Sequence, residues 1–138
     1  MRTLHVTCLA LALSASVATA ADGDFDPTYG LFNSGKNTVG LDLGGSNNDL
    51  LSDMLVAPDG SAYLVGTSNR DTGYTAASVV KMTPQGLQDS TFDSHDGYSV
   101  LGPINSDTYA EHASFDTQGN VIVAATQLAG AQDTSLAI

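Results

Sequence analysis

Short apolar runs alternate with clusters of turn-forming residues along this chain. The clearest example is Met54–Thr67, MLVAPDGSAYLVGT, in which two apolar runs flank a Pro58-Asp59-Gly60 turn. Proline sets the φ angle of the first central turn position, aspartate suits the second, and glycine accepts the left-handed conformation that follows. A turn this short joins neighbouring antiparallel strands. The pattern therefore predicts strands over Leu51–Ala57 and Ser61–Thr67.

Two further runs belong to the same unit. Apolar residues alternate with others within Asn37–Leu43, NTVGLDL, and Thr75–Met82 has the composition of another strand. The sequence Thr83-Pro84-Gln85-Gly86 then repeats the chemistry of the first turn. No segment of helical length has a sustained apolar period of three to four residues. We therefore expect an all-β protein with about four short antiparallel strands per unit.

The same order of strands and turns begins again after Gly86. Val121–Thr126, VIVAAT, matches Ala62–Thr67, AYLVGT, and Gln118-Gly119 stands where the first copy has Asp59-Gly60. Repeats of several short strands at a period close to ~60 residues predict a propeller-like array of stacked sheets. The expected organisation is a signal peptide over residues 1–20, a first repeat unit over 21–86 and a second over 87–138.

The second unit is expected to be incomplete. The counterpart of Gly86 would follow Gly119 by the same distance that separates Gly86 from Gly60, and that position lies beyond Ile138. A repeat cut within a strand leaves an unpaired edge. We therefore expect either that the chain is a fragment of a longer array or that another copy completes its last strand. The expected partners are further repeat units or another protein chain.

Residues Met1–Ala20 have the three parts of an export signal. Arg2 supplies the positive start, Leu9–Leu13 the apolar centre, and Ala18-Thr19-Ala20 the small residues that a signal peptidase needs. The apolar run is short and is followed by serines, which argues against a membrane span, although an uncleaved anchor is the alternative. We expect cleavage near Ala21 and an exported chain that is periplasmic, secreted or at the cell surface.

Charge and cysteine content narrow the possible partners. The sequence has 4 Lys and Arg residues against 15 Asp and Glu residues, with a net charge of −11. Phosphate binding needs clustered Lys and Arg, so nucleic acid is excluded as a partner, and no membrane insertion is expected after signal cleavage. The acidity favours solubility outside the cell, with cation binding as the alternative. Cys8, the one cysteine, precedes the apolar core of the signal, so the mature chain has neither disulfide bonds nor Cys-based metal sites.

The strand-turn-strand pattern is followed by Lys81–Phe92, KMTPQGLQDSTF. Together these features resemble the delta-60 repeat family of bacterial secreted or surface proteins. Units of that family have a strand, a Pro-Asp-Gly turn, a strand, and a segment of the form R/K-hydrophobe-x-Pro-x-Gly-x-x-Asp-x-x-Phe. The match is good in the first unit and looser in the second, where Thr117-Gln118 replaces Pro-Asp. The resemblance covers nearly all of the mature chain and implies a propeller-like β fold without an assigned activity.

Three alternating aspartates, Asp22, Asp24 and Asp26, are the candidate metal ligands. They are similar to the start of a calcium loop, but an EF-hand requires Gly at the sixth position and Glu at the twelfth. Those positions hold Pro27 and Asn33. Asp26 also has a repeat counterpart in Asp89, which suggests a role in a turn. We expect no cofactor, with calcium at these aspartates as the alternative.

A second candidate metal site comprises Asp93, His95 and Asp96, with His112 as a distant partner. Zinc needs three or four convergent ligands, and only these two histidines follow the signal peptide. A hydrolytic triad is arithmetically possible, but Gly-x-Ser-x-Gly and His-Glu-x-x-His are both absent. A solvated histidine in a polar loop is the ordinary interpretation, and we expect no enzymatic activity.

Most aromatic residues recur at matching repeat positions, so we expect core packing for Phe25, Tyr29, Phe32, Tyr63, Phe92 and Phe115. Tyr74, Tyr98 and Tyr109 lie in or beside predicted loops and are the candidates for stacking on a ligand.

The function that the sequence favours is an exported, non-catalytic β-repeat module that binds or scaffolds at the cell envelope or outside the cell. A calcium-stabilised extracellular module and a secreted hydrolase are the alternatives. The turn residues Pro58, Asp59, Gly60, Pro84, Gly86 and Gly119 are expected to be structural.

Overall fold

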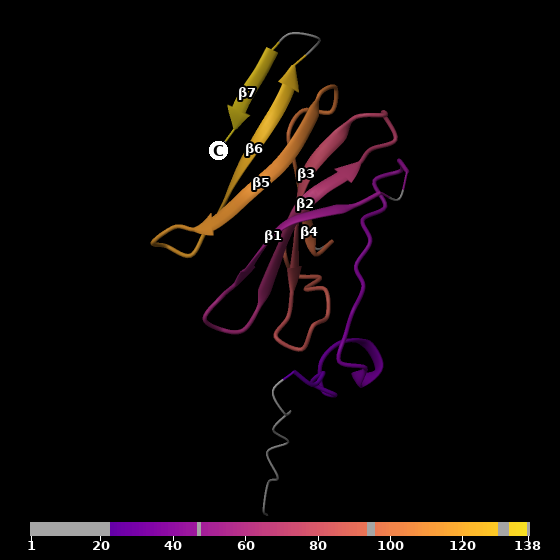
Figure 1. Ribbon diagram of the computed structural model, residues 1–138, viewed down its shortest axis with the longest axis vertical. Coiled ribbons are helices and arrows are strands. Elements are labelled where there is room, and N and C mark those ends of the chain that lie inside the picture. Colours follow the sequence, from indigo (N-terminus) through magenta and orange to yellow (C-terminus); the bar gives the residue numbers. More distant parts are fainter. Residues whose placement is uncertain (1–22, 47, 94–95, 130–132, 138) are drawn as a thin grey trace, which may run out of the picture.

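Two antiparallel sheets make up the computed structural model, which describes residues 23–46, 48–93, 96–129 and 133–137 (Figure 1). The first sheet has the strand order β1-β2-β3-β4 and the second has the order β5-β6-β7. The strands are β1 Leu50–Val56, β2 Ala62–Asn69, β3 Thr75–Met82, β4 Tyr98–Leu101, β5 Asp107–Phe115, β6 Val121–Ala129 and β7 Asp133–Ala137, preceded by the 3-10 turn η1 Leu31–Asn33. The all-β prediction is confirmed for the described residues. No helix among them is long and apolar enough to cross a membrane.

The strands predicted around the two proline turns are confirmed. β1 and β2 cover the predicted ranges to within two residues at each end, and β3 has the predicted bounds. Local signals explain this agreement, because alternation defines each strand and the turn residues define where it stops.

The two hairpins of the expected repeat share one register. β1 pairs with β2 from Leu50↔Thr67 to Val56↔Ala62, with a bulge between Leu51 and Asp53. Adding 59 to each number gives the pairing of β5 with β6, including the bulge, which lies between Ala110 and His112. Ser52 and Glu111 are thus equivalent bulge residues.

The alternating apolar segment Asn37–Leu43 forms no strand. This segment has no strand partner among the described residues, and its only sheet-like contacts are isolated bridges from Leu43 and Gly44 to Arg70. Extended backbone becomes a strand only where a neighbour supplies hydrogen bonds. The apolar residues of the segment instead cover one face of the first sheet.

The first sheet crosses the expected boundary between residues 86 and 87. β4, which the sequence places in the second unit, pairs with β3 from Ala77↔Leu101 to Val80↔Tyr98. The first sheet therefore has four strands, and the second has three in the described part of the chain. Among the described residues, the expected first unit thus holds three strands, β1 to β3, and the expected second unit holds four, β4 to β7, the first of which pairs with the first sheet.

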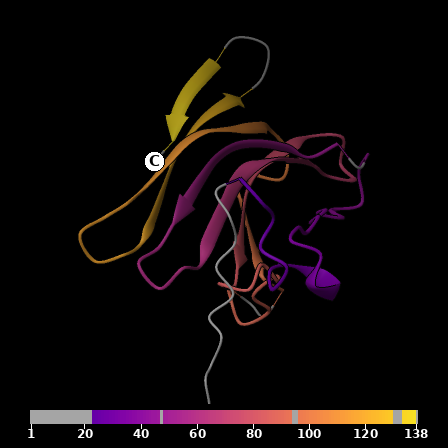
Figure 2. The same ribbon diagram turned by 60° about the horizontal axis from the view of Figure 1, so that its bottom comes forward.

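Each face of the first sheet is covered differently. One face packs against the second sheet, and the buried residues of that core are Val65, Ala77, Val79, Ala110, Val123 and Ala125. On the opposite face, Leu41 packs with Val80 and Met82. Figure 1 shows the first sheet between the β5–β7 sheet and the segment that precedes β1, and Figure 2 shows the same order from another direction.

Candidate functional site

The turn residues predicted to be structural lie in turns. Gly60 has φ 85°, and its N–H donates to Ala57 O at 2.9 Å, while the Asp59 carboxylate accepts hydrogen bonds from the Ser61 N–H and hydroxyl. The hydroxyl and N–H bonds from Ser61 lower the pKa of Asp59. The turn at Pro84 closes through a 2.8 Å bond from the Gly86 N–H to Thr83 O. Gly119 closes the matching turn of the second hairpin, with φ 86°.

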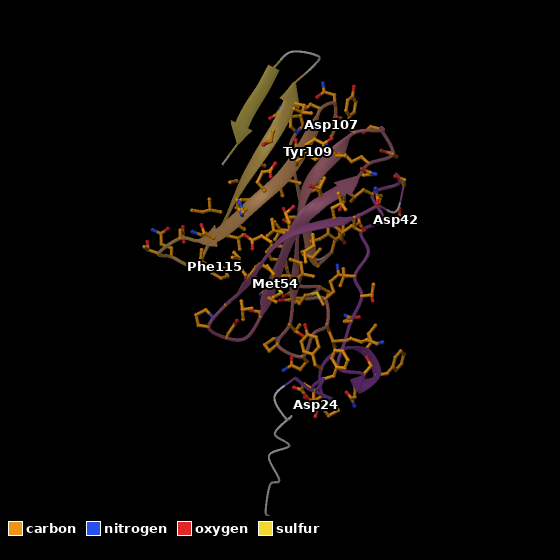
Figure 3. The ribbon with its side chains drawn as sticks, in the orientation of Figure 1. Asp24, Asp42, Met54, Asp107, Tyr109 and Phe115 are labelled. Carbon is orange, nitrogen blue, oxygen red and sulfur yellow. The ribbon has the colours of Figure 1, made fainter. Side chains whose placement is uncertain are left out.

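Two of the three candidate calcium aspartates, Asp24 and Asp26, lie in the described structure. Asp22 lies outside the described residues, and Figure 3 shows Asp24 at the opposite end of the molecule from Asp42 and Asp107. Asp26 Oδ1 accepts hydrogen bonds from Thr28 N at 2.8 Å and Thr28 Oγ1 at 2.6 Å, which lower the pKa of Asp26. Among the described residues, no three His, Cys, Asp or Glu side chains form a group that could hold a metal ion.

Asp89 confirms that Asp26 has a turn role, because it makes the same contacts one repeat later. Its Oδ1 accepts from Thr91 N at 3.0 Å and Thr91 Oγ1 at 2.6 Å. Its other oxygen lies 2.9 Å from Lys81 Nζ. The bond from the Thr91 hydroxyl, followed by the Lys81 contact, lowers the pKa of Asp89 to about 2.

The second candidate metal site is not assembled in the described residues. His95 lies outside them, and Asp93 and Asp96 are exposed loop residues. His112 lies on β5, and its Nδ1 is 3.8 Å from Asp53 Oδ2 on β1. The partner of His112 is therefore a carboxylate of the other sheet, and this residue belongs to the contact between the sheets.

Aromatic packing agrees only in part with the prediction. Tyr63 makes edge-to-face contacts with Phe92 and Phe115, at centroid distances of 5.8 and 5.5 Å, beside the core between the sheets. The prediction is wrong for Phe25 and Phe32, which are 74% and 97% exposed. Both lie before β1, in the part of the chain around η1. Of the three candidate stacking tyrosines, Tyr98 packs against the outer cluster around Leu41, Tyr109 lies on β5, and Tyr74 is 40% exposed.

Two of the three cations expected in the mature chain are held by the fold. Arg70 is only 9% exposed, and its guanidinium donates to the carbonyls of Gly102, at 3.0 Å, and Pro103. Lys81 pairs with Asp89 and lies 5.8 Å from the centre of the Tyr63 ring. These contacts fix loops and sheet edges, so neither cation extends freely to an anionic ligand.

The contact between the sheets is polar where the bulges meet. Ser52 Oγ donates to Ala110 O at 2.6 Å, and Ala110 N donates to Thr67 Oγ1 at 3.2 Å. Bulges take backbone groups out of the strand ladder, which leaves these groups available to another element. The β5 bulge thus uses its freed backbone to bind the first sheet.

Two aspartates extend this contact along β5. Asp53 Oδ2 accepts from Ala113 N at 3.0 Å, which is the main cause of the lowered pKa of Asp53. Near the start of β5, Asp107 Oδ1 accepts from Thr75 N at 2.8 Å and from the Thr75 hydroxyl at 3.0 Å. The second sheet is therefore joined to the first by hydrogen bonds at both ends of β5, with the apolar core between them.

The candidate functional surface is the outer face of the first sheet, opposite this contact. Leu51, Met54 and Val56 on β1 are 66%, 54% and 61% exposed. A groove of about 280 Å³ runs beside them between the sheet and the preceding segment, and its lining includes Leu41, Leu51 and Leu64. Exposed contiguous apolar surface of this kind marks an interaction site. This surface is not apparent from the sequence, because the apolar pattern does not reveal which face of a strand remains uncovered.

Comparisons of the chain with protein-family models, with curated proteins and with solved structures found no match. The resemblance to delta-60 repeats therefore stays a prediction from the motif residues.

Proposed function

We propose that this chain is an exported, non-catalytic β-repeat module that scaffolds or binds at the cell envelope or outside the cell. In this proposal its sheets are parts of a propeller-like array, and its partners are further repeat units or another protein chain. The module acts by packing sheet against sheet.

The observation that carries the proposal is the packing of one repeat on the other through equivalent hairpins. The second sheet covers one face of the first with β5 and β6, whose register repeats that of β1 and β2. Tandem repeats that bury apolar surface against one another are typical of scaffolds and extended binding surfaces. The opposite face of the first sheet carries the same kind of apolar residues, so the packing can continue.

The polar side chains favour a structural role. Asp26, Asp59 and Asp89 accept hydrogen bonds within their own turns, and Asp53 and Asp107 accept hydrogen bonds across the sheets. Catalytic carboxylates gather in a cleft around the reacting atoms. These five are instead distributed over separate turns and over the contact between the sheets.

Export is supported by the sequence of residues 1–20, with its positive start, apolar centre and small residues before Ala21. The acidic composition is compatible with solubility outside the cell.

The proposal is tested by expressing residues 1–138 with a C-terminal tag in a bacterium and separating cytoplasm, periplasm and medium. Mass spectrometry of the exported chain is expected to give an N-terminus near Ala21. The same sample is expected to remain unlabelled by a serine-reactive fluorophosphonate and to release no sugar from a glycan panel. An uncleaved chain retained in the cytoplasm, or stoichiometric labelling by the probe, would contradict the proposal.

A further inference from the structure

The outer face of the first sheet is, by repeat position, the same face that the second sheet uses to bind the first. Leu51, Met54 and Leu64 correspond to Ala110, Ala113 and Val123 when 59 is added to each number. The latter three all belong to the core between the sheets or pack against it. Their counterparts on the first sheet have no covering sheet in the described part of the chain.

The groove on this face has an equivalent on the second sheet. Leu41, Leu64 and Gly66 line the first groove, while Leu101, Val123 and Ala125 line the second. Leu41 and Leu101 lie 60 positions apart, and the other two pairs lie 59 apart. The segment around Leu41 therefore lies on the first sheet as β4 lies on the second.

The segment around Leu41 differs from β4 in one respect, which is its strand pairing. β4 is hydrogen-bonded to β3, whereas residues 38–41 have no strand partner among the described residues. The counterpart of β3 in the second sheet is β7, which in the described part of the chain pairs only with β6. Among the described residues, β7 thus has a neighbour on one edge only, and the segment 38–41 has no strand beside it.

Side-chain sizes on the two faces are complementary. Within the chain, the large Tyr63 and Val65 of β2 belong to the same core between the sheets as the small Ala113 and Ala110 of β5, or pack against it. On the outer face of the second sheet the counterparts of Tyr63 and Val65 are the smaller Ile122 and Ala124, because successive residues of β6 alternate between faces. The smaller residues would therefore meet the larger Met54 and Leu51. Cores tolerate such exchanges when the total volume is kept.

We infer that a second copy of this chain covers the outer face of the first sheet, with the outer face of its own β5–β7 sheet. The strand β7 of that copy pairs antiparallel with residues 38–41, and Ile122 packs over Met54. The contact is head-to-tail, because each copy contributes a different face, so association continues into rings or filaments. The inference rests on the proposed function, because in both the module works by packing one sheet against another.

The register of the strand pairing follows from the repeat. The pairs Ala77↔Leu101 and Ser78↔Val100 of the first sheet become Leu136↔Leu41 and Ala137↔Gly40 between copies. In a single copy the Leu41 N–H is bound by Asp49 Oδ2 at 2.9 Å, and pairing with β7 would replace that bond. Adding a strand to an exposed edge in this way is a common mode of protein recognition.

Association is tested first by sedimentation and light scattering of the purified chain up to about 1 mM, a range that detects weak interfaces. Oligomers that grow with concentration are expected. Leu51→Lys and Ile122→Lys are each expected to be monomeric alone, and their mixture is expected to form dimers, because each variant keeps the face that the other lacks. Ile104→Lys is the matched control, since Ile104 is 72% exposed in the loop before β5.

A gain of affinity separates this interface from a folding defect. Ser52 Oγ donates to Ala110 O within the chain, and the residue that takes its place between copies is Glu111, which is not a donor when ionised. Glu111→Ser is expected to tighten association by about 2- to 10-fold, the effect of one hydrogen bond. Glu111→Ala removes the charge without supplying a donor, so it is the control and is expected to gain less.

The register is tested by crosslinking in a Cys8→Ser background. Copies that carry Gly40→Cys are mixed with copies that carry Ala137→Cys, and a disulfide between them is expected. Copies that carry Gly40→Cys mixed with copies that carry Thr134→Cys are the control. These two positions are out of register, so no disulfide is expected between them.

A wild-type chain that stays monomeric throughout the concentration range, or a mixture of the two lysine variants that forms no dimer, would overturn the inference. Thermal melting of each variant shows whether a monomer is folded. Export and the absence of hydrolase labelling are measured separately, so a monomer that is exported and inert would contradict the self-association alone.

Discussion

Leu51 and Ala110 occupy the same position in the two sheets, each being the last paired residue before a bulge. Ala110 is 4% exposed because its sheet packs on another, whereas Leu51 is 66% exposed. The difference comes from the neighbours of the two residues, since their strand register is the same. Repeat position therefore gives a direct comparison between a covered and an uncovered face.

The core between the sheets is expected to dominate stability. Val65 is fully buried, so Val65→Ala is expected to lower the free energy of unfolding by about 2 kcal/mol, from lost burial and the cavity left behind. Val56→Ala is the matched control, because Val56 is 61% exposed, and its effect is expected to be within about 0.5 kcal/mol. Urea unfolding at low protein concentration measures both. Equal losses in the two variants would contradict this description of the core.

Gly86 is expected to be less tolerant of substitution than Gly73. Both have positive φ, 74° and 83°, so alanine at either position incurs about 1 kcal/mol of backbone strain. A Cβ at Gly86 would overlap the Tyr29 ring, whereas a Cβ at Gly73 meets no atom within 4 Å. Gly86→Ala is therefore expected to lower the free energy of unfolding by about 1–3 kcal/mol more than Gly73→Ala does. Tyr29→Ala is expected to relieve the overlap, so the two substitutions should be non-additive in urea unfolding.

The elements that could be predicted from the sequence are those with local causes. β1, β2 and β3 follow from alternation and from turn residues such as Gly60, which constrain only their own neighbourhood. The segment 37–43 has the same alternation but forms no strand, because strand formation also needs a partner that the local pattern does not reveal.

Contacts and exposures that depend on how the sheets pack could not be predicted from the sequence, for a related reason. The contact of His112 with Asp53 depends on how two sheets pack, and the two residues lie far apart in the sequence. The exposure of Phe32 likewise depends on which elements pack around the η1 loop. The sequence does contain one relevant signal, the 59-residue spacing that relates Ser52 to Glu111. Once one contact between sheets is known, this spacing identifies which faces of the two sheets are equivalent.

Acid is expected to weaken the turn that Asp89 closes. The pKa of Asp89 is about 2 in the folded protein, below the value of ~3.9 usual for an unfolded chain. Its stabilising contribution is therefore present above about pH 4 and is lost as the pH falls toward 2. Melting temperatures between pH 6 and pH 2 should fall less steeply in Asp89→Asn than in the wild type. Asp96→Asn, an exposed carboxylate of the next loop, is the control and should keep the wild-type slope.

Calcium is expected to leave stability unchanged. The Asp26 carboxylate is already held by Thr28, and the described residues offer no group of three possible ligands. Melting temperatures in excess calcium and in excess chelator should therefore agree. A higher melting temperature in calcium that disappears in Asp24→Ala would instead support the calcium-stabilised module.

Thr108 is expected to be replaceable by valine with a gain in stability. Its side chain is 2% exposed, and within the described structure its Oγ1 has no hydrogen-bond partner. The equivalent residue of the first sheet is Asp49, whose carboxylate accepts a hydrogen bond from the Leu41 N–H. The counterpart of Leu41 is Leu101, which lies on β4 and is paired with β3. A buried hydroxyl without a partner costs about 1–3 kcal/mol, and valine has nearly the same shape. Thr108→Val should therefore raise the free energy of unfolding by about 1 kcal/mol, whereas Thr108→Ser keeps the hydroxyl, loses a methyl group and should lower it. If the valine variant is less stable than the wild type in urea, the Thr108 hydroxyl has a hydrogen-bond partner and the expectation is wrong.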